Sequence, residues 1–352
     1  MKRLFVFTLL IVALGVVPVF GVATNYNIHR KPNASWFTGS ASDPAWGWMK
    51  EIDSLVEVGS QLGTGQAFFV DSGVTTEGNG TTWATAKDTL DEAVALCTAN
   101  RGDIIYVAQG HAETLTAADD VDVDVAGVTV IGVGNGSLAP TFTYTAAAGE
   151  IAVGASNVTI ANIKCISSVT AVLKAIDIEA AAENVNILGC VFKVELPGTD
   201  EFIDTITVKA ASHGAVIANC LFDQGGASNS GPQSAINFLD CNDIRIANNK
   251  FFGDCAVACI ENETTASVYI AIEGNTLFNA IIGGNGGLNA QPCIELVATT
   301  TGVISDNYIV CNHATAAESV VAADCYLFEN YYNEDESSAG TGGLIGTASG
   351  ND

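Results

Sequence analysis

An eight-residue pattern recurs eight times between Val128 and Tyr332, and it constrains the fold more than any other feature of this sequence. Its copies include VTIANIKC, VNILGCVF, AVIANCLF, IRIANNKF and IAIEGNTL. Successive copies begin 23 to 32 residues apart. A period in this range is typical of solenoids, in which each repeat covers its neighbour. Alternating apolar and polar residues inside the octet predict that the repeated unit is a strand.

The register of the octet predicts what lies inside the coil. The third position is aliphatic in every copy, so it should face the core. The eighth position predicts a stack of aromatic rings formed by Phe192, Phe222 and Phe251. The sixth position begins with Cys190 and Cys220 and then predicts a ladder of amide hydrogen bonds through Asn249, Asn275, Asn307 and Asn330.

Each repeat also contains a second strand-like segment, as in AIDIEAA, TITVKAA, SAINFLD, ACIENET and PCIELVA. β-Branched residues and the Gly and Asn turns within each repeat argue against a helical array. The predicted fold is therefore all-β, a parallel β-helix solenoid of about eight or more rungs. We expect the coil over residues 128–332, and an acidic Gly/Ser-rich tail over 333–352 that is either a flexible terminus or a docking arm.

The segment before the repeats has a different texture. Residues 68–70 and 103–108 predict strands, and Trp83 to Leu96 predicts an amphipathic helix. The stretches TTWATA (81–86) and GDIIYVAQG (102–110) resemble the N-terminal part of right-handed parallel β-helix proteins of the pectin-lyase-like superfamily. The resemblance implies that residues 66–127 form a cap and the first strands, with the helix covering the open apolar core.

Enzymes of that superfamily cut acidic polysaccharides, and the resemblance implies two routes. Lyases use Ca²⁺ held by carboxylates and an Arg or Lys base. The weak catalytic candidate in this chain is Arg245 together with Asp223, Asp243 and Asp254. The alternative is that Arg245 only forms an ion pair with one nearby Asp. Hydrolases of the polygalacturonase kind carry an Asp trio that this chain lacks in the matching region, so no catalytic role is transferred.

Long turns after three octets offer a different candidate site. Segments 195–204, 223–233 and 279–292 would form a wall beside the coil if they leave the same edge, and they are inert loops otherwise. The candidate ligand-binding residues on them are Asp200, Glu201, Asp204, Asp223 and Gln224. No cofactor is predicted, Ca²⁺ is compatible with the acidic side chains, and the identity of any metal site is left open.

The amino-acid composition limits the kinds of partner that the protein can bind. The chain has 13 basic and 39 acidic residues, a net charge of −26, which disfavours nucleic acids and anionic membrane surfaces. Residues 1–23 read as a signal peptide, with an uncleaved membrane anchor as the alternative, and 24–65 read as a loop and short helix. Of ten cysteines, Cys255 with Cys259 is the best local disulfide candidate, and stacked buried thiols are the alternative.

The fourth octet position points away from the core and is mostly apolar, which predicts that the N-terminal segment or neighbouring subunits cover it. We therefore expect a homo-oligomer, such as a trimer. The resemblance is closest to phage and environmental β-helix proteins and implies a secreted, cell-surface or virion-surface protein. Its expected role is structural or adhesive toward a polysaccharide or cell-surface glycan, and the alternative is a secreted polysaccharide lyase or glycoside hydrolase.

Overall fold

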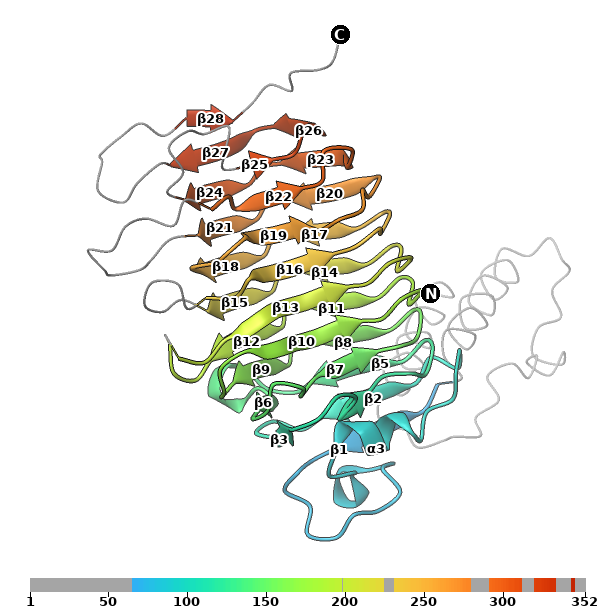
Figure 1. Cartoon of the computed structure of the whole chain (residues 1–352). Coiled ribbons are helices and arrows are strands. Elements are labelled where there is room, and N and C mark those ends of the chain that lie inside the picture. The colour runs from blue at the N-terminus through green and yellow to red at the C-terminus, as the bar shows by residue number, and fades with distance from the viewer. Residues whose placement is uncertain are drawn as a thin grey trace, which may run out of the picture. The chain divides into compact units, whose positions relative to one another are not determined.

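The computed structural model describes residues 65–197, 199–224, 231–279, 291–311, 320–333 and 343–345. The chain divides into two compact units, residues 1–64 and 65–352, and every described residue belongs to the second. The signal-like leader and the 24–64 extension therefore lie outside the described residues. The described part is a parallel β-helix, which Figure 1 shows as a stack of rungs coloured from blue to red.

Three long sheets run along the stack, and we call them sheets A, B and C. The strands of sheet A are β1 (Ala67–Val70), β2 (Ile104–Val107), β5 (Thr129–Gly132), β8 (Thr159–Ala161), β11 (Asn186–Leu188), β14 (Val216–Ala218), β17 (Arg245–Ala247), β20 (Ile270–Glu273), β23 (Thr301–Ser305) and β26 (Asp324–Phe328). Those of sheet B are β3 (Ala112–Leu115), β6 (Thr141–Tyr144), β9 (Lys164–Ser167), β12 (Val191–Val194), β15 (Leu221–Gln224), β18 (Lys250–Gly253), β21 (Thr276–Asn279), β24 (Tyr308–Cys311), β27 (Asn330–Asn333) and β28 (Gly343–Ile345). Those of sheet C are β4 (Val121–Asp122), β7 (Ile151–Val153), β10 (Val172–Ile178), β13 (Phe202–Val208), β16 (Ser234–Phe238), β19 (Ala258–Asn262), β22 (Ile294–Leu296) and β25 (Val320–Val321).

The octet spans sheets A and B, and the second segment of each repeat forms sheet C. The third octet position faces inward and is fully buried from Val130 to Ile304. The rings of Phe192 and Phe222 stack with centroids 4.9 Å apart, and those of Phe222 and Phe251 with centroids 4.5 Å apart. The predicted all-β solenoid is confirmed, and sheet A begins at Ala67, so the coil starts earlier in the chain than the octets do.

The asparagines of the sixth octet position lie in the turn between sheets A and B. The Nδ2 atom of Asn275 donates to the carbonyl of Ile246, at 2.9 Å, and to Oδ1 of Asn307, at 3.0 Å. Its own Oδ1 accepts from the backbone N–H and the Nδ2 of Asn249. Asn307 bonds to Asn330 in the same way. Each ladder amide donates to a carbonyl of the preceding rung, and all but that of Asn330 also donate to the asparagine of the next rung.

The cap differs from the helix expected over Trp83 to Leu96. A 3₁₀ turn, η1 (Trp83–Thr85), and a short helix, α3 (Leu90–Val94), replace one continuous helix. The reason is Lys87, whose backbone N–H donates to the carbonyl of Phe69 and forms a β-bridge with Val70. The chain is therefore extended before Thr89, which caps α3. Leu90, Ala93 and Val94 of α3 are buried in the core, as a cap requires. A second 3₁₀ turn, η2 (Gly136–Leu138), lies between β5 and β6.

At the C-terminal end, β28 pairs antiparallel with β27, which is a reversal of the parallel pairing along the rest of sheet B. On the outer face of sheet A, Ala218 and Ala247 are buried, while Phe328 is 47% exposed. The described residues include no helix with the length and hydropathy of a membrane span. All ten cysteines lie in the described part of the chain, where none is joined in a disulfide bond, and nine of them are buried.

Candidate functional site

The outer face of sheet C carries a row of polar side chains. In each central rung an inward Ile is followed by a polar residue that faces outward, and register pairing aligns these residues from rung to rung. We call this set the polar row; its members are Asp177, Thr207, Asn237, Glu261 and Glu295. Because parallel strands lie about 4.8 Å apart, the row presents one polar group per rung along the axis.

Asp177 is the most heavily paired member. Its Oδ2 atom accepts from Nζ of Lys174, at 2.6 Å, and from Nζ of Lys209, at 2.7 Å. Glu150 lies 3.7 Å from the first lysine and Glu179 lies 3.7 Å from the second. The carboxylate is only 1% exposed, so both ammonium groups offset the cost of burying its charge.

The next rungs are linked by side-chain hydrogen bonds. Asn237 donates through Nδ2 to Asp204, at 3.4 Å, and to Glu263, at 3.2 Å. Two carboxylates on one side fix the orientation of this amide, so its Oδ1 points elsewhere. Ser234 donates to Glu261 on the following rung.

Burial on this face changes the acidity of its carboxyls. Burial raises the pKa of Asp204 to about 6, the hydrogen bond from Asn237 opposes this, and the charge of Glu263 adds to it. Burial also raises the pKa of Glu261, with a further contribution from Asp204. Protonation states that differ from ordinary carboxylates near neutral pH are common at functional sites.

Unsatisfied oxygen atoms gather on the same face. Among the described residues, six buried side-chain oxygens lack a hydrogen-bond partner, and four of them belong to strands of sheet C. They are Oδ1 of Asp177, Oδ1 of Asp204, Oγ1 of Thr207 and Oδ1 of Asn237. Buried polar atoms in native proteins are normally satisfied, so a cluster of exceptions calls for an explanation. The arrangement suits a ligand that donates hydrogen bonds, or a hard cation.

The predicted ligand-binding residues separate in the structure. Asp204 lies on β13, and Gln224 donates through Nε2 to Thr205 on that strand, at 2.6 Å. Asp200 is buried and accepts from the backbone of Leu196, at 3.0 Å. Asp223 faces outward from sheet B, where it pairs with Lys193 at 2.6 Å. Glu201 immediately precedes β13, and burial raises its pKa.

The residues predicted as weak catalytic candidates do not form one site in the structure. Arg245 lies on sheet A and forms an ion pair with Glu273 on the next rung, with Nη2 and Oε1 2.5 Å apart. Asp223 lies on sheet B, Asp243 occupies a left-handed turn before β17, and Asp254 is buried after β18. Arg245 is therefore paired with a carboxylate outside the predicted set, 28 residues along the chain.

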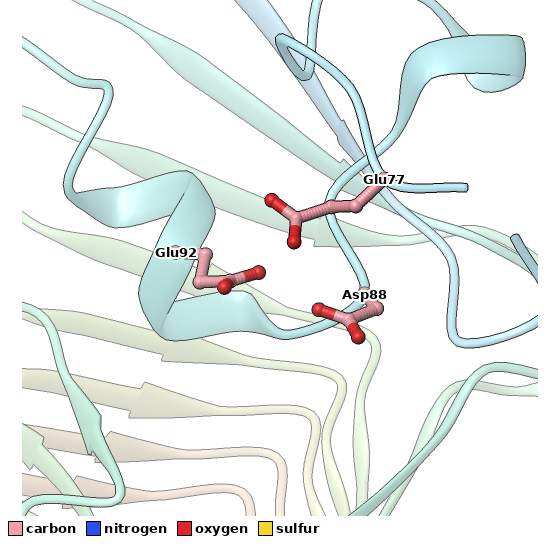
Figure 2. Close-up of side chains that lie close together, drawn as sticks. All are labelled: Glu77, Asp88 and Glu92. Carbon is pink, nitrogen blue, oxygen red and sulfur yellow. The ribbon is translucent and has the colours of Figure 1, made fainter.

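A separate acidic cluster lies at the cap and is shown in Figure 2. Oxygens of Glu77, Asp88 and Glu92 lie within 4.8 Å of one another, and no other group of three His, Cys, Asp or Glu in the described part of the chain does so. Lys87 pairs with Glu77. Burial and a hydrogen bond with Asp88 raise the pKa of Glu92. The cluster has the carboxylates that Ca²⁺ prefers, but a lysine and a raised carboxyl pKa already reduce its negative charge.

Sequence reasoning missed the polar row, although its signal was present. In the second segment of each repeat, the residue after the inward Ile is Asp177, Thr207, Asn237, Glu261 and Glu295 in successive rungs. The octets drew attention to sheets A and B, whereas the unsatisfied oxygens lie on sheet C.

Comparison with known proteins bears on the fold. No family model matches the sequence, and no curated protein matches it. Two crystal structures of a pectin methylesterase from Aspergillus niger are similar. The deglycosylated form is 16% identical, with 78% of this chain and 88% of that chain covered and a TM-score of 0.43. The penultimately deglycosylated form is 17% identical over the same coverage, with a TM-score of 0.41.

A third similar structure is Geobacillus virus E2 ORF18. It is 12% identical, covers 85% of this chain and 65% of that chain, and has a TM-score of 0.32. The assignment of the fold comes from the molecule itself. Three sheets of parallel strands, with one strand from each in every complete rung, make this chain a parallel β-helix, which is the fold that the resemblance of its sequence implied.

Proposed function

We propose that this protein is a surface β-helix, exported or carried on a virion, that binds a glycan along the outer face of sheet C. The observation that carries the proposal is the cluster of unsatisfied acceptor oxygens on Asp177, Asp204, Thr207 and Asn237. Sugar hydroxyl groups are hydrogen-bond donors, and a chain of sugars offers them repeatedly. These acceptors repeat along the coil axis, and because the oxygens are buried, a glycan has to displace the side chains that cover them in order to reach them.

Charge on this face indicates which glycans it prefers. Two lysines on this face, Lys174 and Lys209, are outnumbered by seven carboxyl groups: Glu150, Asp177, Glu179, Asp204, Glu261, Glu263 and Glu295. The whole chain has a net charge of −26. Like charges repel across an interface, so a neutral glycan or one with amino groups fits this face better than a polyanion.

The experiment is a binding measurement on a panel of neutral, amino-bearing and acidic polysaccharides, using the chain from Ala23 onward. Asn237→Ala and Thr207→Val remove two of the acceptors. Asn186→Ala and Thr159→Val are matched controls, because both side chains face outward from sheet A. The proposal expects affinity to fall at least tenfold in the first pair only. Equal affinity in all four variants would place any glycan site elsewhere.

The second candidate is glycan hydrolysis or elimination at the same face, and a specific observation favours it. Asp204 has a pKa of about 6, and its charge acts on Glu261, which also has a raised pKa. A protonated carboxyl beside an ionised one is the pair that glycoside hydrolases use. The same panel, followed for new reducing ends and unsaturated products, separates the two functions. Cleavage abolished by Asp204→Asn would make the protein an enzyme, whereas binding without cleavage leaves it an adhesin.

A further inference from the structure

Four cysteines form a row of thiols inside the C-terminal half of the coil, outside any site described above. Cys255 follows β18, Cys259 lies on β19, Cys293 immediately precedes β22 and Cys311 ends β24. Their exposed fractions are 2%, 0%, 0% and 1%. Figure 1 shows these strands in neighbouring rungs of the orange and red part of the coil.

The thiols touch in a fixed order. The sulfur atoms of Cys255 and Cys259 are 3.9 Å apart. The side chain of Cys259 also interacts with that of Cys293, and the side chain of Cys293 with that of Cys311. The Cys293 thiol donates to the carbonyl of Val310, the residue before Cys311, at 3.6 Å. Register supports this order, because Ile260 and Ile294 are partners in sheet C and the two cysteines directly precede them. The row therefore has two inner thiols with two thiol neighbours each and two outer thiols at its ends.

We propose that this row is a disulfide site, in which Cys255 pairs with Cys259 and Cys293 pairs with Cys311. This pairing oxidises all four thiols and uses the contact at each end of the row. A bond between the two inner cysteines would leave both outer ones reduced. A tetrahedral metal site is a poorer fit, since no three cysteine sulfurs in the described part of the chain lie mutually within 4.8 Å.

The two bonds would fix connections between sheets B and C. Cys255 and Cys259 lie within the connection from β18 and at the start of β19. Cys293 immediately precedes β22, and Cys311 is the last residue of β24. The second bond would therefore tie the start of a strand of sheet C to the end of a sheet B strand on the next rung.

The chemistry needs an oxidant, and a small-molecule disulfide such as oxidised glutathione supplies it. A thiolate of each pair attacks the glutathione disulfide and releases one glutathione thiol. The second thiolate then attacks the mixed disulfide and releases another, so each pair loses two protons and two electrons. Because the thiols are buried, the reaction takes place during folding or local opening, before the rungs close over them.

The test refolds the chain from denaturant in a glutathione redox buffer, then denatures it and alkylates the remaining thiols. We expect six of the ten cysteines to be alkylated, with the four of the row protected. No Lys or Arg follows Lys250, so trypsin leaves the whole row in one fragment. Cleavage after Glu separates Cys293 from Cys311, so their bond appears as two joined peptides, whereas Cys255 and Cys259 stay in one peptide that lacks two hydrogens.

Variants give an independent readout. Oxidation should raise the melting temperature of the wild type by about 5 °C or more. Cys311→Ala should lose part of that gain, and the double variant Cys255→Ala with Cys311→Ala should lose all of it. Cys241→Ala is the control, because this buried thiol bonds to the carbonyls of Leu239 and Lys209 and should keep the full gain.

Three results would overturn the proposal. They are alkylation of all ten cysteines after refolding to the native circular dichroism spectrum, a bond between Cys259 and Cys293, and protection of Cys190 and Cys220 in place of the row. The last two residues are a useful internal comparison, because they occupy adjacent rungs and their side chains also interact with each other, while each thiol donates to a backbone carbonyl.

Discussion

The asparagine ladder and the polar row of sheet C are both polar, both buried and both repeated from rung to rung, yet their hydrogen bonding is opposite. Within the ladder, Asn275 uses its amide as donor and acceptor toward its neighbours. On sheet C, Asp177, Thr207 and Asn237 each retain an oxygen without a partner.

The difference arises because the ladder repeats the same residue in successive rungs, whereas the polar row does not. An amide carries a donor and an acceptor, so a column of identical amides satisfies itself. The polar row changes from Asp to Thr to Asn to Glu, and carboxylates supply acceptors only. A column of identical amides therefore stabilises the fold, whereas a column of mixed polar residues keeps oxygens that can accept hydrogen bonds from a ligand.

The largest expected effect comes from breaking the ladder. Asn275→Ala removes the acceptor for the backbone N–H and the Nδ2 of Asn249, both fully buried, and opens a small cavity. We expect a loss of about 3 kcal/mol in the free energy of unfolding, measured by urea denaturation. Asn186→Ala on the outer face of sheet A should cost less than about 0.5 kcal/mol. A loss below about 1 kcal/mol for Asn275→Ala would show that the ladder contributes little.

The second prediction concerns Asp204, where a substitution should raise the free energy of unfolding instead of lowering it. Its pKa is raised from 3.8 to about 6 in the folded state, so the folded protein binds the extra proton and stability falls as pH rises from about 4 to about 6. Asp204→Asn removes this loss, because the amide does not titrate.

We therefore expect Asp204→Asn to stabilise the protein by about 2 kcal/mol at pH 7 and to have little effect near pH 4, in denaturation series across pH. Reduced glycan binding in the same variant would show that the site keeps a destabilising carboxyl for its function. A variant that is equally stabilised at both pH values would refute a titration origin.

A smaller effect is expected from extending the ladder. Cys220 occupies the ladder position one rung before Asn249, and its thiol donates weakly to the carbonyl of Ile187, at 3.6 Å. Cys220→Asn would replace this with an amide that also accepts from the backbone of Cys190. We expect a gain of about 1 kcal/mol in urea denaturation. A loss of stability would mean that the extra volume of the amide does not fit beside Phe192.

The smallest effect tests an unsatisfied hydroxyl. Thr207→Val removes the Oγ1 atom that lacks a partner while keeping the shape of the side chain. Since no intramolecular hydrogen bond is lost, stability should change by less than about 0.5 kcal/mol or increase slightly. A clear destabilisation in the same denaturation assay would show that the hydroxyl is satisfied in solution.

The inward positions of the octet could be predicted from sequence because burial repeats with the chain's own period. Ile160 and Ile187 are core residues for the same reason in each rung. The partners of outward residues could not be predicted, since they depend on the neighbouring rung and on turns of variable length. Arg245 meets Glu273, and Asp204 meets Asn237, across intervals of 28 and 33 residues. The continuous cap helix that the periodicity predicted does not form, because the β-bridge at Lys87 keeps the chain extended at that point.

The ladder asparagines are separated by 26, 32 and 23 residues, yet each bonds to the next with the same geometry. The pitch of the coil is therefore independent of how many residues each turn of the chain contains. Insertions and deletions between sheets are free to accumulate without disturbing the axis. In such a scaffold the segments between the sheets can diversify quickly, whereas the buried interior positions stay under strict selection.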